Sequence, residues 1–413
     1  MIHASPAPRH VPGASFPLSA GLQAVKRILI DERPDWRDQA EGLGFHFHTI
    51  DGERYWDETA YYEFSLAQIE QDIEAPTEAL HDMALELVSE VVDSEDLLTR
   101  LNIAPQYWDW IATSWRQRDP HLYARMDLSY AGTGPAKLLE LQYDTPTSLY
   151  EGAYFQWLWL EDQIRAGQLP GHADQYNSIQ EKLLEALATL AQHRLIGSAL
   201  HFSAVRESEE DRATVRYLRD CAHQVGITTR EVVIEDIGVS GEGWFTDDED
   251  NVIQTLFKLY PLEFMMEERF GPALTTRRMQ LIEPAWKAVL SNKGVLALLW
   301  ERHAGHPNLL PAHFADADAG ASPAAGWVRK PLLSREGANI RIALPDGTTL
   351  ETDGPYDDGP AIMQAYHPLP CFDGNYPLVG SWVIGDTAAG VGIREDATLI
   401  TQNTSRFVPH AIL

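Results

Sequence analysis

The spacing of apolar residues predicts a largely helical N-terminal half. Between Asp57 and Leu101, apolar residues recur at intervals of three and four positions, which places them on one face of a helix. Pro76 is expected to separate two helices in this stretch, because proline removes a helical hydrogen bond. Further elements are expected as short segments over 22–30 and 34–41 and as helices over 106–117, 150–166 and 174–193.

Two other segments of this half have strand patterns. Residues 121–143 alternate apolar and polar side chains on both sides of a Gly-Thr-Gly turn, which predicts a β-hairpin. Residues 196–239 hold an apolar run, an amphipathic stretch and a second β-branched run, which predicts a β-α-β unit. Helices are expected to follow near 251–270 and 285–303.

The C-terminal part is rich in β-branched runs. Strands are predicted over 326–333, 338–344, 361–366, 377–385, 388–394 and 397–401. The first two flank a loop that contains Ser334, Gly337 and Asn339, and the first carries Lys330. A strand lysine beside a small-residue loop is typical of hairpins that bind phosphate groups. An ordinary exposed hairpin is the alternative interpretation of the same pattern.

Composition narrows the classes of partner. The chain has 413 residues, 44% of them hydrophobic, and a formal net charge of -29. This charge argues against nucleic acid or an anionic membrane as the main partner. It is compatible with a cationic substrate such as a polyamine, or with no more than a soluble surface. Two cysteines provide no disulfide framework, and with no signal-peptide pattern they favour a cytoplasmic protein.

The hairpin 121–143 carries the first candidate chemistry. Alternate residues of a strand share a face, so Arg125 and Asp127 point the same way, as do Glu140 and Gln142 on the returning strand. Carboxylate and amide oxygens are ligands for phosphate-bound Mg²⁺, although an ordinary solvated strand face would look similar. The hydroxyls of 145–148 precede a predicted helix, where they can cap it or help to bind an anion.

Two further basic residues stand in less distinctive settings. Lys293 lies near the middle of the helix predicted over 285–303, where a lysine is usually just solvated. Arg394 ends a predicted strand and is followed by Glu395 and Asp396. An arginine there can stabilise charge on a transferring phosphoryl group, and a salt bridge within a turn is the alternative.

Together these segments resemble the glutathionylspermidine synthase family of ATP-grasp carbon–nitrogen ligases. More narrowly, the chain is similar to stand-alone bacterial acid–amine ligases that have no amidase domain. The matching segments are 32–36, 125–127, 144–150, 257–261, 283–286, 291–293, 330–331, 334–339 and 392–396.

The resemblance implies a mixed α/β (α+β) chain with an ATP-grasp fold after a pre-ATP-grasp-like α/β domain. The division that we expect is a mobile tail at 1–21, a helical region with the hairpin at 22–195, an α/β unit at 196–280, and a nucleotide-binding region at 281–413. The Ala/Asp/Pro-rich segment 314–325 is expected to form a mobile loop.

The resemblance also implies roles for individual residues. Arg125 and Arg394 match arginines near the acyl phosphate. The implied Mg²⁺ ligands are Asp127, Glu140 and Gln142. The implied ATP-binding residues are Lys293, Lys330, Ser334, Gly337, Gln364, Ala365 and Tyr366. The acid or amine would contact Thr145, Thr147, Glu210 and Asp211. Gln142 departs from the family pattern, which has asparagine at this position.

The activity implied is ATP- and Mg²⁺-dependent ligation of a small acid to an amine through an acyl phosphate. The acid could be a peptide or glutathione-like, and the amine a polyamine. A nucleotide-binding regulator that keeps the ligase fold without turnover is the alternative. A purely structural acidic protein would not need the lysine and glycine pattern of 330–337.

Overall fold

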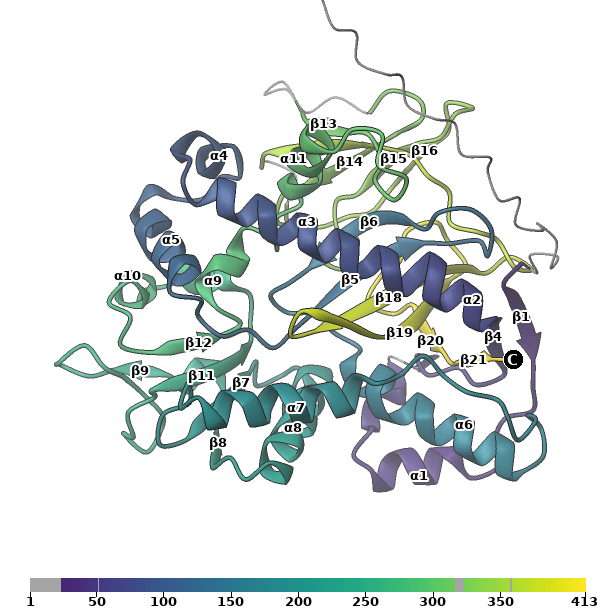
Figure 1. Cartoon of the computed structure of the whole chain (residues 1–413), viewed down its shortest axis with the longest axis horizontal. Coiled ribbons are helices and arrows are strands. Elements are labelled where there is room, and N and C mark those ends of the chain that lie inside the picture. Colours follow the sequence, from purple (N-terminus) through teal and green to yellow (C-terminus); the bar gives the residue numbers. More distant parts are fainter. Residues whose placement is uncertain (1–23, 51, 316–322, 357–358) are drawn as a thin grey trace, which may run out of the picture.

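A five-stranded antiparallel sheet forms the centre of the computed structural model, which describes residues 24–50, 52–315, 323–356 and 359–413 (Figure 1). Its order is β20-β19-β18-β5-β6. The strands are β5 (Tyr123–Ser129), β6 (Lys137–Gln142), β18 (Tyr376–Ile384), β19 (Thr387–Asp396) and β20 (Arg406–Val408). The predicted hairpin 121–143 is confirmed as β5 and β6, and β5 pairs along β18 from the other end of the chain. The predicted segments 22–195 and 281–413 therefore share one sheet.

A second antiparallel sheet contains the predicted lysine hairpin. Its order is β13-β17-β14-β15-β16. The strands are β13 (Ala312–Phe314), β14 (Trp327–Pro331), β15 (Arg341–Ala343), β16 (Thr349–Glu351) and β17 (Ala361–Ala365). β14 pairs with β15, so the hairpin that carries Lys330 is confirmed. The expected mobile loop 314–325 falls mostly on 316–322, which lie outside the described residues.

A parallel sheet of order β12-β11-β7-β8 forms the α/β layer. Its strands are β7 (Leu200–Ala204), β8 (Thr229–Glu231), β11 (Thr255–Leu259) and β12 (Gln280–Ile282). Helix α8 (Glu209–Gln224) connects β7 to the parallel β8, which confirms the β-α-β unit. The helix expected over 251–270 is wrong for its first half, because β11 is buried along its whole length. A buried parallel strand has no alternation, so its apolar run was mistaken for helix.

The N-terminal strands close onto the C-terminus. β4 (Ala60–Phe64) lies between β1 (Lys26–Leu29) and β21 (His410–Ile412). The helix expected from Asp57 is therefore wrong at its start, and the strand expected over 397–401 is absent from that described segment. The paired strands there are β20 and β21. Two small hairpins complete the strands: β2 (Thr49–Ile50) with β3 (Glu53–Arg54), and β9 (Gly238–Val239) with β10 (Phe245–Thr246).

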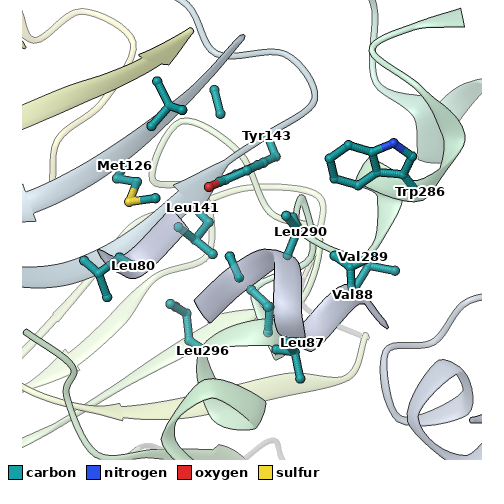
Figure 2. Close-up of a cluster of buried hydrophobic side chains, with 14 of the residues drawn as sticks. Leu80, Leu87, Val88, Met126, Leu141, Tyr143, Trp286, Val289, Leu290 and Leu296 are labelled. Carbon is teal, nitrogen blue, oxygen red and sulfur yellow. The ribbon is translucent and has the colours of Figure 1, made fainter. Parts of the chain in front are cut away.

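The long helix of the N-terminal half packs on the central sheet. It runs without a break through α2 (Leu66–Gln68), a π-helical turn (Ile69–Glu74) and α3 (Ala75–Val91). The prediction that Pro76 separates two helices is wrong. Pro76 occupies the first turn of α3, where its missing N–H costs little. Figure 2 shows Leu80, Leu87 and Val88 of this helix among buried side chains from β5, β6 and the segment before α11.

The other helices cover the remaining faces. They are α1 (Trp36–Gly42), α4 (Glu95–Arg100), α5 (Trp108–Arg116), α6 (Gln156–Arg165), α7 (Ile179–Gln192), α9 (Leu262–Glu267), α10 (Gly271–Leu274) and α11 (Gly294–Arg302). The single helix predicted over 285–303 is a 3-10 turn, Ala285–Ala288, followed by α11. Lys293 therefore immediately precedes α11 and does not lie in mid-helix. No helix among the described residues is long and apolar enough to cross a membrane.

Candidate active site

A cavity of about 200 Å³ lies between the central sheet and the sheet that contains β14. Its walls come from both sheets, from the segment 145–148 and from the loops at 335–337 and 399–403. Twelve of the sequence-predicted site residues line it: Arg125, Asp127, Glu140, Gln142, Thr145, Thr147, Lys330, Gly337, Gln364, Ala365, Tyr366 and Arg394. The fold thus brings into one cavity residues that are up to 269 positions apart, from 125 to 394.

The β5–β6 hairpin supplies the polar floor of this cavity. Its register places Arg125 opposite Gln142 and Asp127 opposite Glu140. Arg125 donates from Nε to Asp127 Oδ1 at 2.7 Å and from Nη2 to Oδ2 at 3.1 Å. Gln142 donates from Nε2 to Glu140 Oε1 at 2.5 Å. The hairpin pattern therefore predicted correctly that these four side chains share a face.

The fit to a divalent cation rests on three oxygen donors. Within the described part of the chain, no group of three or more His, Cys, Asp or Glu side chains is arranged to hold a metal ion. The predicted set of Asp127, Glu140 and Gln142 has two carboxylates and an amide. This number suits Mg²⁺, which keeps several water or phosphate oxygens and uses few protein ligands. The donors therefore fit a Mg²⁺ ion that a nucleotide brings with it.

Both predicted nucleotide lysines lie near Glu140. Lys330 donates from Nζ to the carbonyl of Leu139 at 2.8 Å, and burial lowers its pKa to about 8, against the opposing effect of Glu140. Lys293 Nζ lies 2.7 Å from Glu140 Oε1 and also donates to the carbonyl of Ser334. Lys293 and Ser334 do not line the cavity themselves; Lys293 contacts Glu140, which does, and Ser334 accepts a hydrogen bond from Lys293.

The loop 334–339 is held over the cavity by contacts that the sequence did not indicate. Arg335 donates from Nη2 to Glu263 of α9 at 2.8 Å and from Nη1 to Thr145 Oγ1 at 2.6 Å. Gly337 has a φ of +72°, and a Cβ there would lie 2.6 Å from the carbonyl oxygen of Thr401. Glycine is therefore required for the loop to approach this closely. Arg335 stood within a matching segment, but nothing in its local pattern indicated a distant partner.

Arg394 binds backbone carbonyls of a neighbouring loop in addition to facing the cavity. It donates from Nε to the carbonyl of Ser405 and from Nη2 to the carbonyls of Gln402 and Asn403, each at 2.9 Å. Its remaining nitrogen, Nη1, lies 3.2 Å from Ser148 Oγ. Arg394 therefore anchors the loop 402–405 and also presents its charge to the cavity.

Two residues next to the site, Tyr55 and Glu151, were missed by the sequence reasoning, whereas Ser148 is one of the predicted hydroxyls of 145–148. Tyr55 OH lies 3.1 Å from Ser148 Oγ and donates to Glu151, a carboxylate with no exposed surface. Burial raises the pKa of Glu151. Glu151 lies among apolar residues in a predicted helix, which weakly indicated a buried carboxylate, whereas no local pattern indicated a role for Tyr55.

The predicted acidic pair of α8 lies next to these residues. Burial, reinforced by the nearby Glu151, raises the pKa of Glu210 to about 8. Burial also raises the pKa of Asp211 to about 6. Asp211 lines a second cavity of about 800 Å³, which shares Thr145 and Thr147 with the first. The two cavities therefore adjoin at the segment 145–147.

Comparison with known proteins identifies the family. The model of the glutathionylspermidine synthase preATP-grasp family matches residues 27–413. The chain belongs to this family. It is 40% identical over 401 residues to a Haemophilus influenzae protein named "Putative acid–amine ligase", and the match covers 94% of this chain and 99% of the relative.

More distant members of the family are longer than this chain. Trypanothione synthetase of Crithidia fasciculata is 27% identical over 79% of this chain, and the match covers 53% of that protein. The bifunctional glutathionylspermidine synthetase/amidase of Escherichia coli is 23% identical over 91% of this chain, and the match covers 63% of that enzyme. The chain thus spans less than two thirds of these two relatives.

A solved structure supports the fold. A glutathione synthetase-like effector from Globodera pallida superposes with a TM-score of 0.56 at 12% identity, over 93% of this chain and 98% of the effector. The predicted mixed α/β fold of the ATP-grasp type is therefore confirmed. The division at 21, 195 and 280 stays a prediction, as do the roles of individual site residues.

Proposed function

We propose that this protein is an ATP- and Mg²⁺-dependent acid–amine ligase that forms an amide through an acyl phosphate. The observation that carries this proposal is the first cavity, where two arginines, Lys330, two carboxylates and an amide from distant segments line one space. Phosphoryl transfer depends on positioning and on neutralisation of charge, and these are the groups that supply both.

The nucleotide would occupy this first cavity. Lys293 and Lys330 would bind its phosphates, and the backbone of 334–337 would cover them. The segment 364–366 on the β17 side would contact the adenine. Mg²⁺, when bound to Asp127, Glu140 and Gln142, would neutralise charge on the terminal phosphates. The carboxylate of the acid substrate then attacks the γ-phosphate, with ADP as the leaving group.

The acid and the amine would enter through the second cavity. Thr145 and Thr147, which line both cavities, would contact the acid. The acidic side chains of Glu210 and Asp211 are suited to an ammonium group. The amine attacks the acyl carbon, the amide forms and phosphate leaves. Arg125 and Arg394 would stabilise the charge on the phosphoryl group during both steps.

The experiment is phosphate release from Mg²⁺·ATP with a panel of acids and small peptides crossed with polyamines and amino acids. We expect release that requires both an acid and an amine, and a product mass equal to their sum less one water. Lys330→Met should abolish release. Lys182→Met is the matched control, because Lys182 also donates to a backbone carbonyl, that of Ala388, but lines neither cavity.

Two results would contradict the ligase. Phosphate release without dependence on acid or amine would indicate a simple ATPase. Thermal stabilisation by Mg²⁺·ATP with no turnover across the panel would favour the non-catalytic nucleotide-binding regulator. A ligand at 100 times its Kd stabilises the folded state by about 2.7 kcal/mol, so binding alone is readily detected.

A further inference from the structure

A chain of hydrogen bonds leads from the first cavity to a buried carboxylate. Arg394 Nη1 lies 3.2 Å from Ser148 Oγ, which lies 3.1 Å from Tyr55 OH, which in turn contacts Glu151 Oε1. The arginine can only donate, so Ser148 Oγ accepts from it. Tyr55 donates to Glu151 when this carboxylate is ionised, and Ser148 then donates to Tyr55. Each of the three hydrogen bonds from Arg394 to Glu151 therefore has one donor and one acceptor.

Glu151 is placed to accept a proton from this chain. It has no exposed surface, and its Oε2 has no hydrogen-bond partner among the described residues. A buried carboxylate with an unsatisfied oxygen gains by protonation, because burial penalises its charged form. The same burial raises the pKa of Glu151.

The charges around Glu151 and Glu210 favour a state in which one of these two carboxyl groups is protonated and the other is ionised. The groups that act on Glu151 are Tyr55 after β3, Arg394 on β19, Arg125 on β5 and Glu210 on α8. Arg125 is engaged by Asp127 through two hydrogen bonds, which leaves Arg394 to balance Glu151 and Glu210. The fully buried carboxylate of Glu151 and the partly buried one of Glu210 act on each other and share one arginine, so the two do not both ionise readily near neutral pH.

The series of hydrogen bonds begins at the first cavity, with Ser148. Ser148 lines the first cavity beside Arg394 and Thr147. Its φ is +68°, an unfavourable conformation for a residue other than glycine, and it directs the hydroxyl between Tyr55 and Arg394. Unfavourable backbone conformations persist where the surrounding contacts demand them, and they are concentrated at functional sites.

We propose that Glu151 accepts, through Ser148 and Tyr55, the proton that the amine substrate loses when it attacks the acyl phosphate. This inference rests on the proposed function. An aliphatic amine is protonated near neutral pH and is not a nucleophile until it loses a proton. The ammonium proton moves to Ser148 Oγ, the hydroxyl proton of Ser148 moves to Tyr55 and that of Tyr55 moves to Glu151 Oε1. The freed amine attacks, the carbon–nitrogen bond forms and phosphate leaves.

The relay is tested by comparing two nucleophiles in one enzyme. Spermidine is charged at neutral pH and needs a proton acceptor, whereas hydroxylamine is largely uncharged and traps an acyl phosphate without one. The acid is glutathione, or the acid of the panel above that supports the fastest hydroxamate formation. Tyr55→Phe keeps the ring under Arg394, which lies 5.3 Å from the ring centroid, and removes the hydroxyl.

We expect Tyr55→Phe to lower amide formation with spermidine by at least about 100-fold, the usual contribution of a proton-transfer group. Hydroxamate formation with hydroxylamine should stay within about twofold of the wild type. The pH profile with spermidine should also shift to higher pH, toward the titration of the free amine. Ser148→Ala should reproduce this pattern, because it breaks the same chain at the cavity.

The control is Tyr130→Phe. Tyr130 is also buried and donates to a carboxylate, Asp72 at 2.5 Å, but lines neither cavity, so both rates should be unchanged. Equal losses with both nucleophiles in Tyr55→Phe, or full activity with spermidine, would overturn the relay. No hydroxamate from the wild type with any acid would instead overturn the ligase on which it rests.

Discussion

Lys293 Nζ lies 2.7 Å from Glu140 Oε1, so a proposed phosphate-binding lysine is paired with a proposed magnesium ligand. Each group neutralises the charge of the other. In the proposed complex, Mg²⁺ would bind the carboxylate of Glu140 and the phosphates would bind the ammonium group of Lys293. Because Lys293 and Glu140 pair with each other, neither group is left as an unpaired buried charge, which would be costly.

This pairing predicts opposite effects of one substitution. Glu140→Gln should weaken binding of Mg²⁺·ATP by at least about tenfold, as loss of metal-site contacts commonly does. Without Mg²⁺, the same variant should bind ATP as well as or better than the wild type, because Lys293 is released. Titration calorimetry with and without Mg²⁺ measures both affinities. Glu301→Gln, which removes an outlying partner of Arg100, should change neither. A loss of affinity under both conditions would indicate that Glu140 only supports the fold.

Nucleotide binding should also take up a proton. The pKa of Lys330 is lowered to about 8, chiefly by burial, so part of this lysine is neutral at pH 8.5. Triphosphate beside it favours the ammonium form and raises its pKa, so the complex holds more protons than the empty protein. Affinity for ATP should therefore fall as pH rises through about 8.

Calorimetry at pH 8.5 in two buffers with different heats of ionisation measures this uptake. Lys330→Met should abolish it, and Lys182→Met should keep it. An uptake of the same size in Lys330→Met would assign the proton to another group.

Two substitutions of Arg394 separate the effect of its charge on kcat from the effect of its contacts with the loop 402–405. Arg394→Ala should lower kcat by about 100-fold or more, the usual cost of a group that stabilises transition-state charge. Arg394→Lys keeps the charge but cannot donate to the carbonyls of Gln402, Asn403 and Ser405 together. If charge on the phosphoryl group dominates, the lysine variant should retain clearly more kcat than the alanine variant. Equal losses, with the nucleotide affinity intact, would indicate that the arginine acts through the loop 402–405.

Glu210 should make stability depend on pH. Its pKa is raised to about 8 in the folded protein by burial and by Glu151, whereas an unfolded chain has a glutamate pKa of about 4.3. The folded state therefore binds more protons between these values, and its stability is lost as pH rises from about 4.3 to about 8. Glu210→Gln removes this dependence.

Urea unfolding at pH 5 and pH 8 measures the effect. The wild type should lose more stability between these two values than Glu210→Gln does. The neighbouring Glu209 is exposed, so Glu209→Gln should follow the wild type. A parallel loss in Glu210→Gln would show that Glu210 is ionised in the folded protein.

Local sequence patterns were sufficient to predict the two hairpins that carry much of this site. The hairpin 121–143 and the strand that carries Lys330 were predicted correctly, because alternation over a few residues decides which side chains share a face. The errors occurred where local pattern and burial disagree. β11 is buried on both faces and has no alternation, and Pro76 is tolerated in the first turn of α3.

The assembly of these pieces depended on tertiary structure. Residues 125–142 meet β18 because strands from distant parts of the chain pair in one sheet, and they meet Lys330 of β14 because the two sheets line one cavity. The contacts of Tyr55 with Ser148 and of Arg394 with Ser148 join residues 93 and 246 positions apart. Burial and hydrogen-bond partners are set by such long-range contacts, and no local spacing encodes them. The sequence alone was therefore enough to recognise the family and to predict which side chains of the β5–β6 hairpin share a face, whereas the hydrogen bonds from Ser148 through Tyr55 to Glu151 depended on the folded protein.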